Sequence, residues 1–320
     1  MKIISQISLF NFKLFYSILY ILGFGLLAIY SISYKNTGFN NFNRQLLFAA
    51  IALFVFFVIY KINYGIWENY TSIIYLGSIL LLIGVLFLGE ATKGAVSWFS
   101  FYSYHIQPVE LAKIALIILL AKYFSTIKVN DKRFVHVIRS SVYCLIPAAL
   151  TWLQHDLGSA SVLVGIWLIM VLNWGIKKKY LFSMLGIGIV IAVVSWVFVL
   201  ADYQKERVMI LFNPEKDPAG TGYHMIQSMT ALGSGKIYGK GLGFGSQSQL
   251  HFLPEAHTDF IFAAIGEELG FLGITALMVG FLFLFYSLYR IAKNSADNFG
   301  RFITEGVMAM FFIQFIVNIG

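Results

Sequence analysis

Nine long apolar windows constrain what this chain can fold into more than any other feature of its sequence. Most of them approach the roughly 20 residues that a helix needs to cross the hydrocarbon core of a bilayer. Backbone groups in hydrocarbon must find partners within the protein, and a helix provides them along its own length. The sequence therefore predicts an all-α polytopic membrane protein, a bundle of nine transmembrane helices in a single integral membrane domain over residues 1–320. The windows lie at about residues 14–34, 45–62, 70–89, 107–124, 138–153, 157–174, 180–200, 259–289 and 302–320.

The composition supports a membrane protein and excludes several other classes. Of the 320 residues, 59% are apolar and 12% are charged, whereas soluble domains are about 45–50% apolar and about 25% charged. The 31 Phe and 5 Pro exclude a disordered or collagen-like chain, and a single Cys excludes a disulfide scaffold. The sequence contains no Walker A, HExxH, CxxC or GxSxG motif, so a nucleotide-driven pump and a serine hydrolase have no support.

Lysine and arginine set the expected orientation, because the cytoplasmic loops of membrane proteins carry an excess of both. With a cytoplasmic N-terminus, the segments expected inside hold 14 of the 23 Lys and Arg, and the short outer loops hold three. This asymmetry predicts that the N-terminus is cytoplasmic. It also accounts for the net charge of +8 without a nucleic-acid partner.

One long connection separates the seventh and eighth windows, at residues 201–258. The predicted orientation makes it an extracytoplasmic loop, and connections of this length tend to be functional. Residues 223–232 have apolar side chains at helical spacing, which predicts an amphipathic helix on the outer leaflet. Residues 233–245 contain six glycines. They are typical either of a flexible surface loop or of a backbone that brings N–H groups close to a ligand.

Two pairs of neighbouring charged residues fall inside apolar windows. Glu110 and Lys113 are three residues apart, so on a helix they share a face and are expected to pair. Such a pair serves either as an interhelical clamp or as a polar wall of a substrate cavity. Glu267 and Glu268 fall in the eighth window, which is too long for one crossing. We therefore expect its first two turns to form an interfacial or re-entrant helix.

Two aspartates begin apolar windows. Asp156 directly precedes the sixth window, where an Asp is first of all a helix N-cap. Asp259 begins the eighth window, where it competes with Thr258 for the capping role, and His257 and Glu255 lie beside it. A carboxylate at the wet edge of an apolar cavity is also suited to act as a general base. The sequence leaves both roles of Asp259 open.

A metal site in the same region is a further alternative. Three histidines, His224, His251 and His257, occur close to Glu255 and Asp259. These residue types bind zinc, but no spacing here matches a zinc motif. The sequence therefore leaves a metal in this region unknown.

Several short motifs occur along the chain in an order typical of one bacterial family. They are found at residues 107–113 (QPVELAK), 156–160 (DLGSA), 207–214 (RVMILFNP), 222–228 (GYHMIQS), 246–250 (SQSQL) and 252–263 (FLPEAHTDFIFA). In this combination the chain resembles the SEDS proteins of bacterial shape, elongation, division and sporulation, from about residue 90 to residue 320. Residues 246–255 resemble the elongation members of the family more than its division members.

The resemblance implies a fold and an activity. The family has ten transmembrane spans, and nine are expected within residues 1–320, so by this resemblance the chain lacks the last span, on which we expect activity to depend. The implied reaction is the polymerisation of lipid II into peptidoglycan strands, by a glycosyltransferase whose active site faces outward from the bacterial cytoplasmic (inner) membrane. A sugar hydroxyl of the acceptor attacks the anomeric carbon of the donor, and the lipid pyrophosphate leaves with inversion. Asp259 matches the family residue that acts as the general base.

The resemblance also implies supporting residues. Asp156 matches a second family Asp, which orients the acceptor or holds a divalent cation, and no other cofactor is implied. The pyrophosphate leaving group needs positive charge. The candidates for this charge are a divalent cation, Lys93, Lys113, Arg207, Lys236 and Lys240. Further candidate site residues are Glu110, Gln247, Glu255 and His257.

The implied partners are lipid II as the substrate and a class B penicillin-binding protein as the transpeptidase. Two other functions stay open on the sequence alone. The same cavity suits a lipid II flippase, which needs no general base. The chain could also be an inactive scaffold fragment that recruits the transpeptidase. Polymer formation that depends on Asp259 separates the glycosyltransferase from both.

Overall fold

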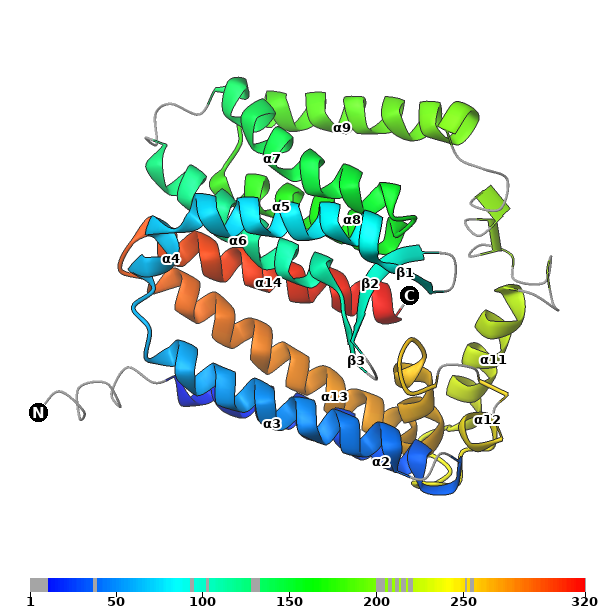
Figure 1. Cartoon of the computed structure of the whole chain (residues 1–320). Coiled ribbons are helices and arrows are strands. Elements are labelled where there is room, and N and C mark those ends of the chain that lie inside the picture. The colour runs from blue at the N-terminus through cyan, green and yellow to red at the C-terminus, as the bar shows by residue number, and fades with distance from the viewer. Residues whose placement is uncertain are drawn as a thin grey trace, which may run out of the picture. The chain divides into compact units, whose positions relative to one another are not determined.

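Long helices dominate the fold, as Figure 1 shows. The computed structural model describes residues 11–36, 39–92, 95–101, 104–127, 133–199, 205–206, 209–210, 213, 217, 221–250, 252–253 and 256–319. Within these ranges, nine helices of 17 residues or more coincide with the nine apolar windows. They are α2 (Phe12–Asn36), α3 (Asn40–Tyr60), α5 (Thr71–Leu88), α6 (Pro108–Thr126), α7 (Phe134–Leu153), α8 (Leu157–Trp174), α9 (Lys178–Val194), α13 (Ile261–Lys293) and α14 (Asn298–Ile319).

Seven of these helices are long and apolar enough to cross a membrane, counting only the residues described. The exceptions are α6, which carries Glu110, Lys113 and Lys122, and α9, which is 17 residues long. The all-α polytopic class is thus confirmed. The number of nine crossings stays a prediction.

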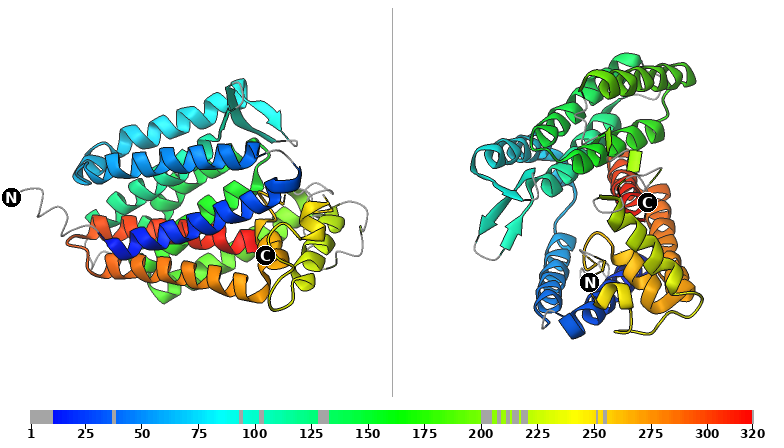
Figure 2. Two further views of the ribbon diagram at one scale, coloured as in Figure 1. Left: turned by 90° about the horizontal axis from the view of Figure 1, so that it is seen from below. Right: turned by 90° about the vertical axis from the view of Figure 1, so that its right-hand side faces the viewer.

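Short elements connect the long helices. They are α4 (Gly65–Asn69), the strands β1 (Glu90–Thr92), β2 (Ala95–Phe101) and β3 (Tyr104–Ile106), the π-helix η1 (Ser195–Val199), α11 (Thr221–Ser234) and α12 (Ser246–Gln249). The strands form an antiparallel sheet in the order β1-β2-β3, which extends beyond the ends of α5 and α6 in Figure 2. Helix α11 contains the stretch 223–232 for which the sequence predicts a helix.

The chain divides into two compact units. The first contains α2, most of α3, the second half of α9, α11, α12 and most of α13, up to residue 287. The second contains α4 to α8, the sheet, the first half of α9, the end of α13 and most of α14. Asp259 belongs to the first unit, and Asp156, Glu110 and Lys113 belong to the second.

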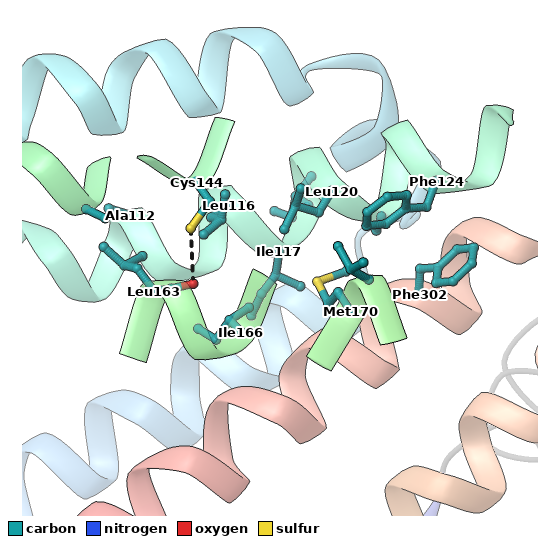
Figure 3. Packing of buried hydrophobic residues seen from close by; sticks show 14 of the residues in the cluster. Ala112, Leu116, Ile117, Leu120, Phe124, Cys144, Leu163, Ile166, Met170 and Phe302 are labelled. Carbon is teal, nitrogen blue, oxygen red and sulfur yellow. Dashed lines mark hydrogen bonds between the residues drawn. The ribbon is translucent and has the colours of Figure 1, made fainter. Parts of the chain in front are cut away.

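Helix α6 lies at the centre of the second unit. Its buried residues pack against α7, α8 and α14 in the cluster drawn in Figure 3. Ile117 and Met170 lie so close to Gly306 of α14 that a side chain there would displace them. Most of α6 is buried against these neighbours, and Lys113 is among its buried residues, whereas Glu110 is exposed. Cys144 is a buried member of the same cluster, and its Sγ lies 3.5 Å from the carbonyl oxygen of Leu163.

Candidate active site

Asp259 lies in the turn at residues 256–260, directly before α13. Apolar contacts hold this turn from both sides, because Ala256, Phe260 and Ala263 pack in one cluster with residues of α2 and α11. The Asp259 side chain is nevertheless exposed. The carbonyl oxygen of Phe260 accepts a hydrogen bond from Ala264 N, 3.1 Å away, so the first helical bond of α13 starts one residue after Asp259. The position favours an accessible carboxylate on a fixed turn over a helix cap.

Helix α11 flanks this turn. The ring of His224 lies 6.4 Å from that of Phe260, and Ala231 belongs to the apolar cluster of the turn. Within the part of the chain that the structure describes, two buried atoms of α11, His224 Nδ1 and Gln227 Oε1, find no hydrogen-bond partner. The sequence indicates His224 only as a possible metal ligand, and it indicates no role for Gln227 beyond its place in the motif at residues 222–228. His224 is a candidate polar contact near Asp259, because its ring approaches that of the neighbouring Phe260.

Helix α13 is broken at its tenth residue, Gly270. Gly270 has φ 65° and ψ −164°, which no helical residue adopts and which is essentially restricted to glycine. The break separates a first segment, residues 261–269, from the rest of α13. This agrees with the expectation that the first two turns of the eighth window form a helix of their own. Whether that segment lies at the membrane interface stays a prediction.

The glycine-rich loop bridges the break. Lys240 N and Gly241 N donate to the carbonyl oxygens of Glu267 and Glu268, at 3.0 and 2.9 Å. On the other side of the break, the N–H groups of residues 271 and 272 donate to the carbonyl oxygens of residues 236 and 237, at 2.9 and 3.1 Å. Gly239, at φ 80°, lies against Gly270, where a side chain on either would collide with backbone. The loop therefore replaces the helical hydrogen bonds that Gly270 interrupts.

The side chain of Glu267 extends this connection. It is fully buried and accepts hydrogen bonds from Lys240 Nζ at 2.9 Å, Gln247 N at 2.9 Å and Ser248 N at 3.0 Å. Lys240 Nζ also donates to Ser246 Oγ, at 2.7 Å. From the sequence, Lys240 is a candidate contact for the pyrophosphate. The structure pairs its Nζ with Glu267, and a role of Lys240 toward a ligand stays a prediction. Sequence reasoning missed Glu267, whose partners lie about twenty residues away in the chain.

Asp156 is the N-cap of α8, which agrees with the capping role expected from its position. Its Oδ1 accepts from Ser159 N at 2.9 Å, and its Oδ2 accepts from Ser159 Oγ at 2.7 Å and from Gln107 Nε2 at 3.1 Å. These three donors hold the carboxylate in one orientation at the start of α8. A role toward the acceptor or a cation stays a prediction.

Glu110 and Lys113 form the expected pair, with Lys113 Nζ 2.7 Å from Glu110 Oε1. The pair lies within α6, and its role as an interhelical clamp or as a wall of a substrate cavity stays a prediction. The Lys113 side chain is 3% exposed and that of Glu110 is 52% exposed. Burial and pairing make Lys113 a poor contact for a pyrophosphate group, whereas Lys236 is exposed.

Four residues considered from the sequence, Lys93, Arg207, His251 and Glu255, lie outside the described residues. His257 is half-buried in the turn before Asp259. Over the described positions, no group of three or more His, Cys, Asp or Glu side chains is arranged to hold a metal ion. A divalent cation therefore gains no support from side-chain geometry.

Comparison with known proteins links the chain to one family. A family model described as cell cycle protein, and named for FtsW, RodA and SpoVE, matches residues 12–320. The probable peptidoglycan glycosyltransferase FtsW of Geobacter metallireducens is 37% identical over 311 residues, which cover 93% of this chain and 81% of that protein. The peptidoglycan glycosyltransferase MrdB of Escherichia coli K12 is 36% identical over 307 residues, or 95% of this chain and 81% of that protein.

Solved structures share the fold. A chain of a peptidoglycan synthase complex, studied for its coordination of polymerization and crosslinking, aligns with a TM-score of 0.82 at 25% identity. The alignment covers 97% of this chain and 86% of that one. The rod shape determining protein RodA of Thermus thermophilus aligns with a TM-score of 0.71 at 22% identity, over 97% of this chain and 84% of that one.

Proposed function

This chain belongs to the SEDS family of cell cycle proteins, and from that membership we propose that it polymerises lipid II into glycan strands as a peptidoglycan glycosyltransferase of cell elongation. The observation that carries the proposal is the 36–37% identity, over more than nine-tenths of the chain, to relatives named peptidoglycan glycosyltransferases. The exposed carboxylate of Asp259 supplies a group with the chemistry that this transfer needs.

Asp259 acts as the general base in this proposal. Its carboxylate takes the proton of the acceptor 4-hydroxyl as that oxygen forms a bond to the anomeric carbon of the donor. The bond between this carbon and the pyrophosphate oxygen breaks on the opposite face, so the configuration inverts and lipid pyrophosphate leaves with the electron pair. A positioned general base contributes about 10²- to 10⁴-fold to a rate. The turn that fixes Asp259 against buried apolar side chains supports this role.

The N-terminus is cytoplasmic in this proposal, and Asp259 faces outward at the bacterial cytoplasmic membrane. The lysine and arginine distribution supports that orientation. Lys236 is the best placed of the described candidate lysines to contact the pyrophosphate, because it is exposed, whereas Lys113 and Lys240 are paired with glutamates. We propose a class B penicillin-binding protein as the partner, supported by the likeness to a chain of a peptidoglycan synthase complex.

Labelled lipid II added to the purified chain in liposomes tests the proposal. We expect glycan strands on a gel from the unchanged chain and none from Asp259→Asn, whose thermal unfolding should match the unchanged chain. Asp297→Asn is the matched control, since Asp297 is an exposed aspartate of the other unit, and it should retain polymerisation. Lipid II that crosses the bilayer without forming polymer, equally in both variants, would instead identify a flippase.

A further inference from the structure

The loop at residues 236–248 and the first segment of α13 are joined by two independent sets of contacts. The first set is backbone to backbone, across the break at Gly270. The second set ends on one carboxylate, that of Glu267. Figure 2 shows α11, α12 and the start of α13 together at one end of their unit, beside the end of α2. The loop is also attached to α2, because Gly243 N donates to Ser31 Oγ at 2.7 Å.

The carboxylate of Glu267 acts here as an internal anion. Burying a charge is costly unless hydrogen bonds and an opposite charge replace its lost hydration. Oε1 accepts from Lys240 Nζ, Ser246 Oγ and Gln247 N, and Oε2 accepts from Ser248 N. Because both oxygens accept and neither donates, the arrangement fits an ionised carboxylate. Every one of these donors belongs to the loop, so satisfying Glu267 requires the loop to stay in place.

Glu267 cannot itself touch a substrate, since it is 0% exposed. It lies, however, in the short helical segment at residues 261–269, which follows the turn of Asp259. A helical segment is stiff, and the eight residues from Asp259 to Glu267 correspond to about 12 Å at the rise of a helix. A shift of the loop relative to Glu267 would therefore change where Lys240 and residue 247 lie relative to Asp259.

We propose that Glu267 is a positioning residue, which fixes the loop at residues 236–248 to the helical segment that follows the turn of Asp259, so that loop, segment and turn move as one rigid piece during glycosyl transfer. The inference rests on the proposed function for its catalytic consequence. Misplacing a reacting group by about 1 Å costs up to about 100-fold in rate. Glu267→Gln keeps the shape but removes the charge, and it cannot accept from all four donors without turning an NH₂ group toward one of them.

Two measurements on Glu267→Gln test the proposal. The first is the split between kcat and KM for lipid II polymerisation. The second is the spectrum of a nitroxide attached at Tyr238→Cys, a position that is 80% exposed in the loop. The chain has one cysteine, Cys144, which is buried, so the label reports on the loop. Glu305→Gln is the matched control, because Glu305 is also a buried glutamate with a basic partner, Arg301 at 2.7 Å, but lies in the other unit.

We expect Glu267→Gln to lower kcat by about tenfold or more, with KM changed less than about threefold, and to make the label more mobile. Glu305→Gln should leave kcat and the spectrum unchanged. A kcat within about threefold of the unchanged chain, or a lower kcat with an unchanged spectrum, would overturn the proposal.

If Glu267→Gln does not fold, Lys240→Met removes one donor only and should change both readouts in the same direction. If the unchanged chain makes no polymer, the proposed function fails, whereas the spectrum still decides whether Glu267 holds the loop.

Discussion

Replacing Gly270 by alanine should strongly destabilise the fold, because both the backbone conformation and the packing at this position exclude a side chain. The backbone at Gly270, with φ 65° and ψ −164°, costs a residue with a Cβ about 1–3 kcal/mol. The added Cβ would also lie 2.6 Å from the carbonyl oxygen of Ile237, with backbone on both sides that cannot turn away. Relief of that contact would loosen the four backbone hydrogen bonds across the break, each worth about 1 kcal/mol. We therefore expect Gly270→Ala to lower the free energy of unfolding by about 3–5 kcal/mol.

An SDS titration of the purified chain, followed by tryptophan fluorescence, measures this loss. Gly23→Ala is the matched control, because Gly23 lies in α2 of the same unit and no atom lies within 4 Å of its added Cβ. Alanine is a better helix former than glycine by up to about 1 kcal/mol, so this variant should be unchanged or slightly more stable. Equal unfolding free energies for the two variants would refute the conclusion that the glycine-rich loop bridges the break in α13. That bridge requires the positive φ of Gly270 and its close approach to the loop backbone.

Two further predictions concern the second unit. Asp156→Ala should cost about 1 kcal/mol of unfolding free energy, whereas Asp156→Asn should cost much less, because asparagine caps helices about as well as aspartate; equal losses would argue against the cap. Asp297 accepts from Tyr64 Oη at 2.6 Å, and this bond, with one from Gly300 N, lowers the pKa of the Asp297 carboxyl. A lowered pKa stabilises the fold above the unfolded value of about 4, and this contribution is lost as the pH falls through the folded pKa. The thermal unfolding temperature should therefore change less between pH 3 and pH 7 in Asp297→Asn than in the unchanged chain. Parallel curves of unfolding temperature against pH for the two proteins would contradict the hydrogen bond between Tyr64 and Asp297.

Local signals account for what the sequence predicted well. Apolar windows depend on neighbouring residues only, and they located all nine long helices that the structure describes. The cap at Asp156 was also predictable, because a cap involves residues three positions apart. The pairing of Glu110 with Lys113 follows from the same spacing.

Contacts between distant segments explain what the sequence could not predict. The sheet β1-β2-β3 consists of strands of three to seven residues, too short to show a clear period. Lys240 looked like a free cation because its partner, Glu267, lies 27 residues further along the chain. The six glycines of the loop are typical either of a flexible loop or of a backbone close to a ligand, whereas two of their positions, 239 and 241, face the broken helix α13. A signal was present in Glu267, since a charged residue in an apolar window needs a partner.

The initial rate of glycan formation by Asp259→Asn, measured with purified protein and lipid II, tests the central claim most directly. The asparagine side chain has nearly the same shape but cannot take the acceptor proton. We predict a rate at least about 100-fold below that of the unchanged chain, with the same thermal unfolding, because a general base contributes about that much or more. A rate within about threefold of the unchanged chain would contradict the assignment of Asp259 as the base.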